Sequence, residues 1–274
     1  MRNRILAGVG VAALATLGLA APANAVSDTT ADVWVVHAVP GVNVDVWING
    51  EPGPADLLDF APEEVVPLVD LEPGEYVIDI QPTGEDLTGA GEGLITLTAD
   101  VEAGVSYTLV AHPLEGGDLA ISPFVNNISE IAAGETRVTA RHTADAPAVD
   151  ILADGGAIFE GVTNTQGADI DVPADTYTVG IAPAGTTDAL FEADLDLAAG
   201  TAYFVHAFGD VEDLGVVVFT IDGLGAAPEG VPAGGAGLVA ESGNSALLGG
   251  AAALLIALLA AAGIIARRAT VSSK

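Results

Sequence analysis

The amino-acid sequence predicts an all-β fold of two tandem immunoglobulin-like β-sandwich domains, and two observations lead to this prediction. Short runs rich in β-branched and aromatic residues, such as VWVVHA, VNVDVWI, EYVIDIQ and LITLTA, are bounded by Gly, Pro and Asp, with no long helical period between them. The same order of runs then occurs a second time. About seven such strands in roughly a hundred residues are typical of an immunoglobulin-like sandwich.

The repeat opens with VHAVPGVNVDVWING (residues 36–50) and RHTADAPAVDILADG (residues 141–155). Three residue types keep a spacing of 105 residues between the copies, namely His37 and His142, Asp45 and Asp150, and Gly50 and Gly155. The spacing falls to 101 residues at Tyr76 and Tyr177 and to 96 at Tyr107 and Tyr203, which places deletions in loops. The sequence therefore predicts one sandwich over residues 31–125 and a second over 135–222, joined by residues 126–134.

The repeated stretch resembles the signature of a bacterial surface family known as domain of unknown function 4397. Its typical motif is His-Ala-Ser-Pro-Asp-Ala-Pro-x-Val-Asp-Val-Tyr-Val-Asp-Gly; the second copy holds DAPAVD at residues 145–150, and the first copy has the looser PGVNVD at 40–45. The Pro-Gly-x-Tyr and Ala-Gly-x-x-Tyr steps are similar too. The resemblance covers nearly all of residues 31–222. It implies a β-sandwich on a cell surface, often in tandem, and it implies no activity.

Each motif residue has a structural explanation. Asn49-Gly50 and Asp154-Gly155 are residue pairs that a tight type I′ hairpin needs, because both central residues take positive φ. Asp45 alternates with two valines, so it lies on the opposite strand face from them. We expect it to accept hydrogen bonds from loop amides or from the histidine, and thereby to tie a strand to its connecting loop.

The alternative is a secreted hydrolase or metal-dependent enzyme that uses His37 with Asp45, or His142 with Asp150. A nucleophile is missing, because Ala38 and Thr143 follow the histidines, and the serine of the typical motif is Val39 in one copy and Ala144 in the other. No Gly-x-Ser-x-Gly, His-Glu-x-x-His or phosphate-loop motif occurs. His112 and His206 do not occupy matching positions in the two copies. We therefore predict no catalytic residue and no enzyme.

Acidic residues dominate the composition. All 38 of them lie between Val26 and Gly243, where only Arg137 and Arg141 are basic, so this part carries 2 minus 38, or −36. Such a charge disfavours binding to nucleic acid. With no cysteine, the fold has no disulfides and no thiol chemistry. No cofactor is expected; calcium stays open as a ligand of the carboxylate pairs Asp169/Asp171 and Asp194/Asp196.

The two ends predict export and anchoring. Arg2 and Arg4, an apolar run and the small residues Ala23 and Ala25 are typical of a signal peptide over residues 1–25, although an uncleaved anchor is the alternative. Residues 246–266 are long and apolar enough for one transmembrane helix, and the basic tail 267–274 should stay in the cytoplasm.

Residues 223–243 are rich in Gly, Pro and Ala and predict a flexible stalk. The stalk ends in Val239, Ala240, Glu241, Ser242 and Gly243, which resemble the Leu-Pro-x-Thr-Gly or Leu-Ala-x-Thr-Gly signals that sortases cleave in Gram-positive bacteria. Valine replaces leucine and serine replaces threonine in this chain. Covalent attachment to the wall is thus an alternative to a membrane anchor.

Taken together, the sequence predicts a non-catalytic module on the membrane or cell wall, with the bulk of the chain extracellular. Its role would be binding, adhesion or envelope structure, and its ligand a protein or glycan that the sequence does not identify. A protein that only fills space in the envelope is a further alternative.

Overall fold

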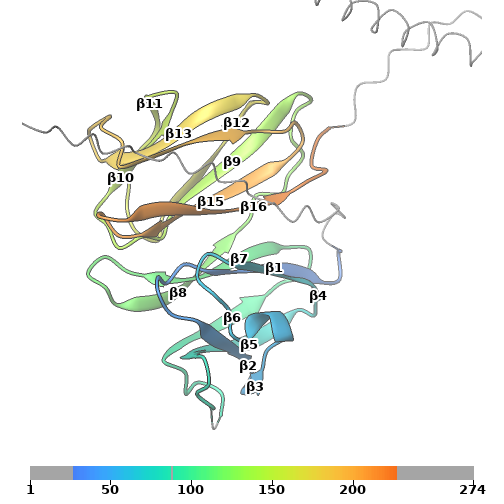
Figure 1. Ribbon diagram of the computed structural model, residues 1–274. Helices are drawn as coiled ribbons and strands as arrows, with labels where there is room; N and C mark the ends of the chain where they lie inside the picture. The colour runs from blue at the N-terminus through green and yellow to red at the C-terminus, as the bar shows by residue number, and fades with distance from the viewer. Residues whose placement is uncertain (1–26, 88, 227–274) are drawn as a thin grey trace, which may run out of the picture. The chain divides into compact units, whose positions relative to one another are not determined.

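The computed structural model describes residues 27–87 and 89–226, which fold into two β-sandwiches, one from each copy of the repeat (Figure 1). Apart from a 3-10 turn at Ala55–Leu57, all regular structure in these residues is strand. The predicted signal peptide, sorting signal, transmembrane helix and tail lie outside the described residues. Within them, no helix has the length and apolar character needed to span a membrane. The all-β sandwich prediction is confirmed.

The first sandwich consists of two four-stranded sheets, ordered β4-β1-β7-β8 and β3-β2-β5-β6. The first strand is central in its sheet and pairs in parallel with β7. Its strands are β1 (Ala31–His37), β2 (Val44–Ile48), β3 (Glu51–Pro52), β4 (Val65–Leu71), β5 (Gly74–Pro82), β6 (Ile95–Val101), β7 (Ser106–Pro113) and β8 (Leu119–Val125).

The second sandwich repeats this topology strand for strand, with sheets ordered β12-β9-β15-β16 and β11-β10-β13-β14. Here β9 is central and pairs in parallel with β15. Its strands are β9 (Glu135–His142), β10 (Val149–Ala153), β11 (Gly156–Val162), β12 (Gly167–Pro173), β13 (Thr176–Pro183), β14 (Phe191–Asp196), β15 (Ala202–Gly209) and β16 (Leu214–Ile221).

The strand order differs from that of an immunoglobulin domain. Constant-type immunoglobulin sandwiches have seven strands, with the first strand at the edge of an ABED sheet that faces a CFG sheet. Each sandwich in this chain has eight strands, and its first strand lies between two neighbours. The sandwich prediction therefore holds for two packed sheets and not for the immunoglobulin-like arrangement, because alternation of apolar and polar residues identifies strands but not their order.

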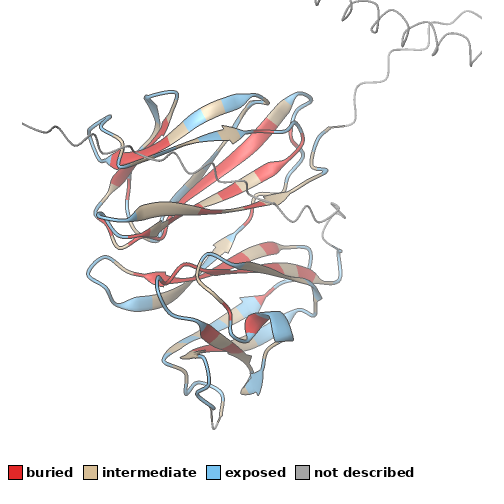
Figure 2. Ribbon diagram, viewed as in Figure 1, coloured by how far each residue is buried: buried red, intermediate tan, exposed pale blue. Residues whose placement is uncertain are grey.

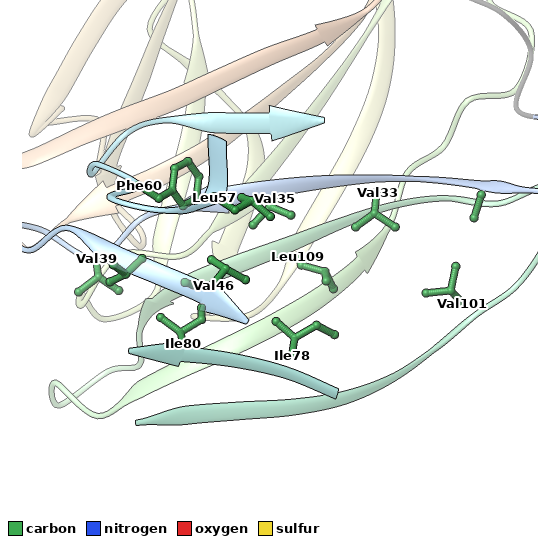
Figure 3. Close-up of a cluster of buried hydrophobic side chains, with 13 residues drawn as sticks. Val33, Val35, Val39, Val46, Leu57, Phe60, Ile78, Ile80, Val101 and Leu109 are labelled. Atoms are coloured by element: carbon green, nitrogen blue, oxygen red, sulfur yellow. The ribbon is translucent and has the colours of Figure 1, made fainter. Parts of the chain in front are cut away.

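Each sandwich has its own apolar core between its two sheets. In the first, alternate residues of facing strands meet, among them Val33 and Val35 from β1 and Ile78 and Ile80 from β5 (Figure 3). In the second, Ile151 and Ile181 belong to the equivalent cluster. The outer strands β6 and β14 alternate partly buried with exposed residues, as expected where one sheet face meets solvent.

A third core lies between the two sandwiches, and we call it the shared core. The sheet β4-β1-β7-β8 of the first copy meets its counterpart β12-β9-β15-β16 of the second, so buried residues concentrate in these two sheets (Figure 2). Its buried members come from both copies and the linker: Trp34, Val36, Ala38, Val110, Ile131, Ala202, Phe204, Val217 and Phe219.

Strand β1 explains why this third core exists. Its residues Val33 and Val35 point into the first sandwich, whereas Trp34 and Val36 point into the shared core. A strand that is buried on both faces has a nearly continuous apolar sequence instead of an alternating one, and VWVV fits that pattern. The Trp34 and Phe219 rings stack with centroids 4.6 Å apart, and Phe204 and Phe219 stack at 4.8 Å.

The linker and the start of the predicted stalk are fastened to the sandwiches. The amide of Ile131 donates to the carbonyl of Leu224 at 2.8 Å, and the amide of Ala226 donates back to the carbonyl of Ile131 at 2.8 Å. Ile131 is fully buried, and Leu224 packs against the shared core. Residues 223–226, which the sequence assigned to the stalk, therefore belong to the folded unit, and both sandwiches fall in one compact unit.

The shared core predicts that the two sandwiches unfold together. Phe204 is fully buried and lies in the aromatic stack, so Phe204→Ala should lower the free energy of unfolding by about 3–5 kcal/mol. Calorimetry of the full chain should show one cooperative transition that shifts as a whole. Phe159→Ala, at a partly exposed position outside the shared core, is the matched control with a smaller loss. Two separate transitions, of which the substitution moves one, would contradict the prediction.

Candidate functional site

The motif histidines end the first strand of each sandwich and are fully buried. The Nε2 atom of His37 lies 2.8 Å from the carbonyl of Val42, and the amide of Val39 donates to its Nδ1 atom at 3.3 Å. Nε2 therefore carries the proton and donates. In the second copy, Nε2 of His142 makes the same contact with the carbonyl of Pro147 at 3.0 Å. Each histidine ties its strand to the loop that follows. Burial lowers the pKa of His37, against the opposing effects of the Val42 bond and of Glu64.

The motif aspartates hold two loops each, and they do so in the same way in both copies. Asp45 accepts the amides of Asp59 at 2.7 Å and Gly84 at 3.0 Å. Asp150 accepts the amides of Gly161 and Gly185, both at 2.7 Å.

The aspartates accept loop amides, which is one of the two kinds of partner expected from the sequence. In the described residues, no hydrogen bond joins either aspartate to a motif histidine. An acid–base pair would need these two side chains within hydrogen-bond reach of each other, directly or through one water.

The glycines of the motif lie in the turns that their sequence predicts. Asn49 and Gly50 have φ of 54° and 81°, and Asp154 and Gly155 have φ of 50° and 76°, so both central residues of each hairpin are left-handed. The first residue of each pair has a further role that the sequence pattern did not indicate. Its side-chain oxygen accepts a backbone amide from the strand on the other side of the hairpin: Val77 of β5 donates to Asn49 at 2.9 Å, and Thr178 of β13 donates to Asp154 at 3.0 Å.

A polar cluster beside the shared core was not anticipated from the sequence. We call it the arginine site, and it consists of Arg141, His206, Asn126, Phe124 and Phe204. The guanidinium of Arg141 donates to the side-chain oxygen of Asn126 at 2.8 Å and to Nε2 of His206 at 3.2 Å. Its carbon lies 4.6 Å from the ring centroid of Phe124 and 5.2 Å from that of Phe204. Contacts with aromatic faces stabilise a cation that has left water.

The electrostatics of the arginine site follow from its burial. Arg141 is 3% exposed, and desolvation lowers its pKa to about 9, with Asp169 acting in the opposite direction. It stays a cation at neutral pH. Desolvation, and then the positive charge of Arg141, lower the pKa of His206 well below its ordinary value. His206 is therefore neutral, and its Nε2 accepts from the arginine. The site joins the copies, because Phe124 belongs to the first, Asn126 to the linker and the other three residues to the second.

Arg137, the other arginine, forms an ion pair with Asp171 of the Asp169/Asp171 pair, which the sequence suggested as a calcium ligand. Nε and Nη2 of Arg137 donate to the two carboxylate oxygens of Asp171 at 2.7 and 2.8 Å, and Asp169 accepts from the side-chain amide of Asn127 at 2.9 Å. In the second pair, Asp194 accepts the hydroxyl of Thr178 at 2.8 Å. In the part of the chain that the structure covers, no group of three or more His, Asp or Glu side chains is placed to hold a metal.

Both basic residues of the described part are buried, Arg137 at 4% and Arg141 at 3% exposed. The charge presented to solvent by residues 27–87 and 89–226 is therefore acidic throughout. No Lys or Arg side chain is therefore exposed in residues 27–87 and 89–226.

Two surface hollows accompany the sandwiches. A groove of about 360 Å³ follows the open edge of the first sandwich and is lined by Ala99, Tyr107 and Val125 among others. A hollow of about 550 Å³ lies between β11 and β12, where Phe159 and Gln166 contribute to its wall. Neither hollow is lined by a histidine or by a motif aspartate. Among the motif residues, His37, His142 and Asp150 are buried, and Asp45 is partly exposed with its carboxylate held by loop amides.

A family profile described as "Domain of unknown function (DUF4397)" matches residues 31–152 and 143–231. The chain belongs to this family. The first match covers the first sandwich, the linker and the beginning of the second sandwich, and the second match begins after β9 and overlaps the first at residues 143–152, so DUF4397 occurs here in two tandem segments. A search of curated proteins finds no match to the chain.

Because Asp150 accepts two loop amides, we predict that its substitution lowers the free energy of unfolding substantially. In Asp150→Asn, the new side-chain NH₂ would face one of two backbone donors, so the free energy of unfolding should fall by about 1–3 kcal/mol. Asp188→Asn, at an exposed position, is the matched control and should change it by less than about 0.5 kcal/mol. Denaturant unfolding measures both. Equal values for the two variants would show that the Asp150 carboxylate does not hold the loops.

The lowered pKa of His206 predicts a pH effect of definite sign. Below about pH 6.5 the unfolded chain binds a proton at this histidine and the folded chain does not, so acid removes stability that is fully present above that pH. Relative to His206→Gln, the wild type should lose up to about 1.4 kcal/mol per pH unit between pH 6.5 and 5. Using the difference between the two proteins cancels the titration of surface carboxylates. A difference that stays constant from pH 7 to 5 would refute the prediction.

Proposed function

We propose that the chain is a non-catalytic module displayed outside the cell, where it serves binding, adhesion or envelope structure. Residues 1–25 would direct export, and residues 246–266 would hold the module to the membrane unless the signal at 239–243 transfers it to the wall. The observation that supports this proposal is the use of the motif residues: each aspartate is engaged by two loop amides, and each histidine by the carbonyl of its own loop.

The rigid joining of the sandwiches supports the same proposal. Because the shared core and the arginine site connect the two copies, the module would present one continuous body and not two independently moving binders. Flexibility would come from the segment after residue 226, whose Gly- and Pro-rich composition suits a spacer. The acidic surface would keep the module hydrated and would favour cationic partners. A protein or glycan ligand fits this role.

Display outside the cell can be tested on the producing cells. Antibodies raised against residues 27–226 should label intact cells without permeabilisation, and a chain truncated before residue 246 should appear in the medium. A chain that lacks residues 1–25 should remain inside and serves as the control. Amine-reactive labels are unsuitable, because the sequence has a single lysine, Lys274. Labelling that requires permeabilisation would refute the proposal.

The enzyme alternative can be separated from the scaffold role by substituting both motif histidines. His37→Gln and His142→Gln together should lower the melting temperature strongly, because each ring holds a strand to its loop in a fully buried position. An unchanged melting temperature with loss of a hydrolytic activity would support an enzyme instead.

A further inference from the structure

One edge strand of the four sheets lacks the features that protect edges from pairing. Sheet edges are normally blocked by prolines or charged side chains, because their free backbone groups are a template for another strand. Seven of the eight edge strands carry at least one such residue: Pro52 in β3, Pro67 in β4, Asp100 in β6, Pro123 in β8, Glu160 in β11, Asp169 in β12 and Asp194 in β14. Strand β16, LGVVVFTI, carries none.

Comparison of the copies shows that β16 lacks a proline that its counterpart β8 contains. Leu109 pairs with Pro123 in the first sandwich, and the equivalent Val205 pairs with Val218 in the second. Val218 therefore occupies the position of Pro123. A proline has no N–H to give to a ladder, so Pro123 must turn its nitrogen away from β7. The N–H of Val218 consequently points away from β15, toward the open edge.

The rest of the edge follows from the geometry of antiparallel pairs. Residues two apart in a strand direct their backbone groups to the same side, so Val216 and Thr220 present theirs at this edge too. Among the backbone hydrogen bonds of the described residues, those of β16 go to β15 alone. The strand therefore offers a row of donors and acceptors along eight uncharged residues.

Charge decides which partner fits this edge. Glu212 and Asp213 precede the strand and Asp222 follows it, while the described surface exposes no basic residue. In antiparallel pairing with a second copy of this chain, Asp213 of one copy would lie near Asp222 of the other, and like charges opposite one another destabilise a ladder. A segment with an uncharged, β-branched centre and Lys or Arg at its ends would meet the acids favourably.

We propose that β16 is a docking edge for an extended peptide segment of a partner protein, with an uncharged β-branched centre and basic ends. The segment adds to the sheet β12-β9-β15-β16 as a fifth strand through main-chain hydrogen bonds, the mode known as β-augmentation. This inference rests on the proposed binding role, and it adds the class of partner, an extended peptide segment, and the binding site, the edge of β16.

A fluorescent peptide KKTVTVTVKK and the full chain in a mild non-ionic detergent provide the test. Fluorescence anisotropy should show saturable binding to the wild type. Val218→Pro introduces the residue that the first copy carries at this position, so it should leave the β15 pairing intact and weaken binding about tenfold or more. Val218→Ile keeps the N–H and is the matched control, with unchanged affinity. Pro123→Val should open the first copy's edge and add a second binding event.

Three outcomes would overturn the proposal. The first is no binding by the wild type, and the second is equal binding by Val218→Pro with an unchanged melting temperature. The third is a wild-type dimer in sedimentation that Val218→Pro dissociates, because a second copy would then be the occupant. The peptide EETVTVTVEE should bind more weakly at low salt, with the difference reduced at about 0.5 M salt. Failure of the peptide test leaves the cell-labelling result unaffected, so the two proposals fail separately.

Discussion

The packing of two equivalent sheets against each other is the contact on which the rest of this structure depends. Strands β1, β7 and β15 supply buried side chains to both of their faces, so neither copy could expose its facing sheet without exposing a large apolar surface. The stacked rings of Trp34, Phe219 and Phe204 fill the middle of the contact. Arg141 shows the same dependence: it comes from the second copy, yet Phe124 of the first copy and Asn126 of the linker supply part of its environment.

The two sheets that meet in the shared core are equivalent in the two copies, so identical copies would present the same surface to each other. In this chain the two surfaces differ, and the differences complement one another. Trp34 and Val36 of the first copy occupy the positions of Thr139 and Arg141 in the second, and Thr108 occupies that of Phe204. At the Trp34/Thr139 and Thr108/Phe204 positions, a large ring in one copy corresponds to a small polar side chain in the other. This divergence favours pairing of the first copy with the second over pairing of like copies.

The sequence predicted what local chemistry determines. Strand runs, the two positive-φ turns at Asn49-Gly50 and Asp154-Gly155, and carboxylates that hold loop amides all follow from spacing and residue type. The arginine site did not follow, because His206 lies 65 residues from Arg141 and nothing in either segment indicates the other. The shared core was missed for a related reason. A continuous apolar run such as VWVV shows that both faces are covered, but the covering element is the other copy, and pattern alone does not say so.

Residues common to both copies and residues particular to one copy therefore have different meanings. The common ones, His37 with His142 and Asp45 with Asp150, hold loops in the same way in both copies. Positions where the copies differ distinguish one sandwich from the other. The loop from Gly84 to Ile95 is five residues longer than its counterpart from Gly185 to Phe191, and the amides of Gly91 and Gly93 in this loop donate to the buried Asp79 of β5. For the binding role proposed above, such differences would select a partner by shape and backbone pairing, and the acidic surface of residues 27–87 and 89–226 would restrict partners to those that carry positive charge or none.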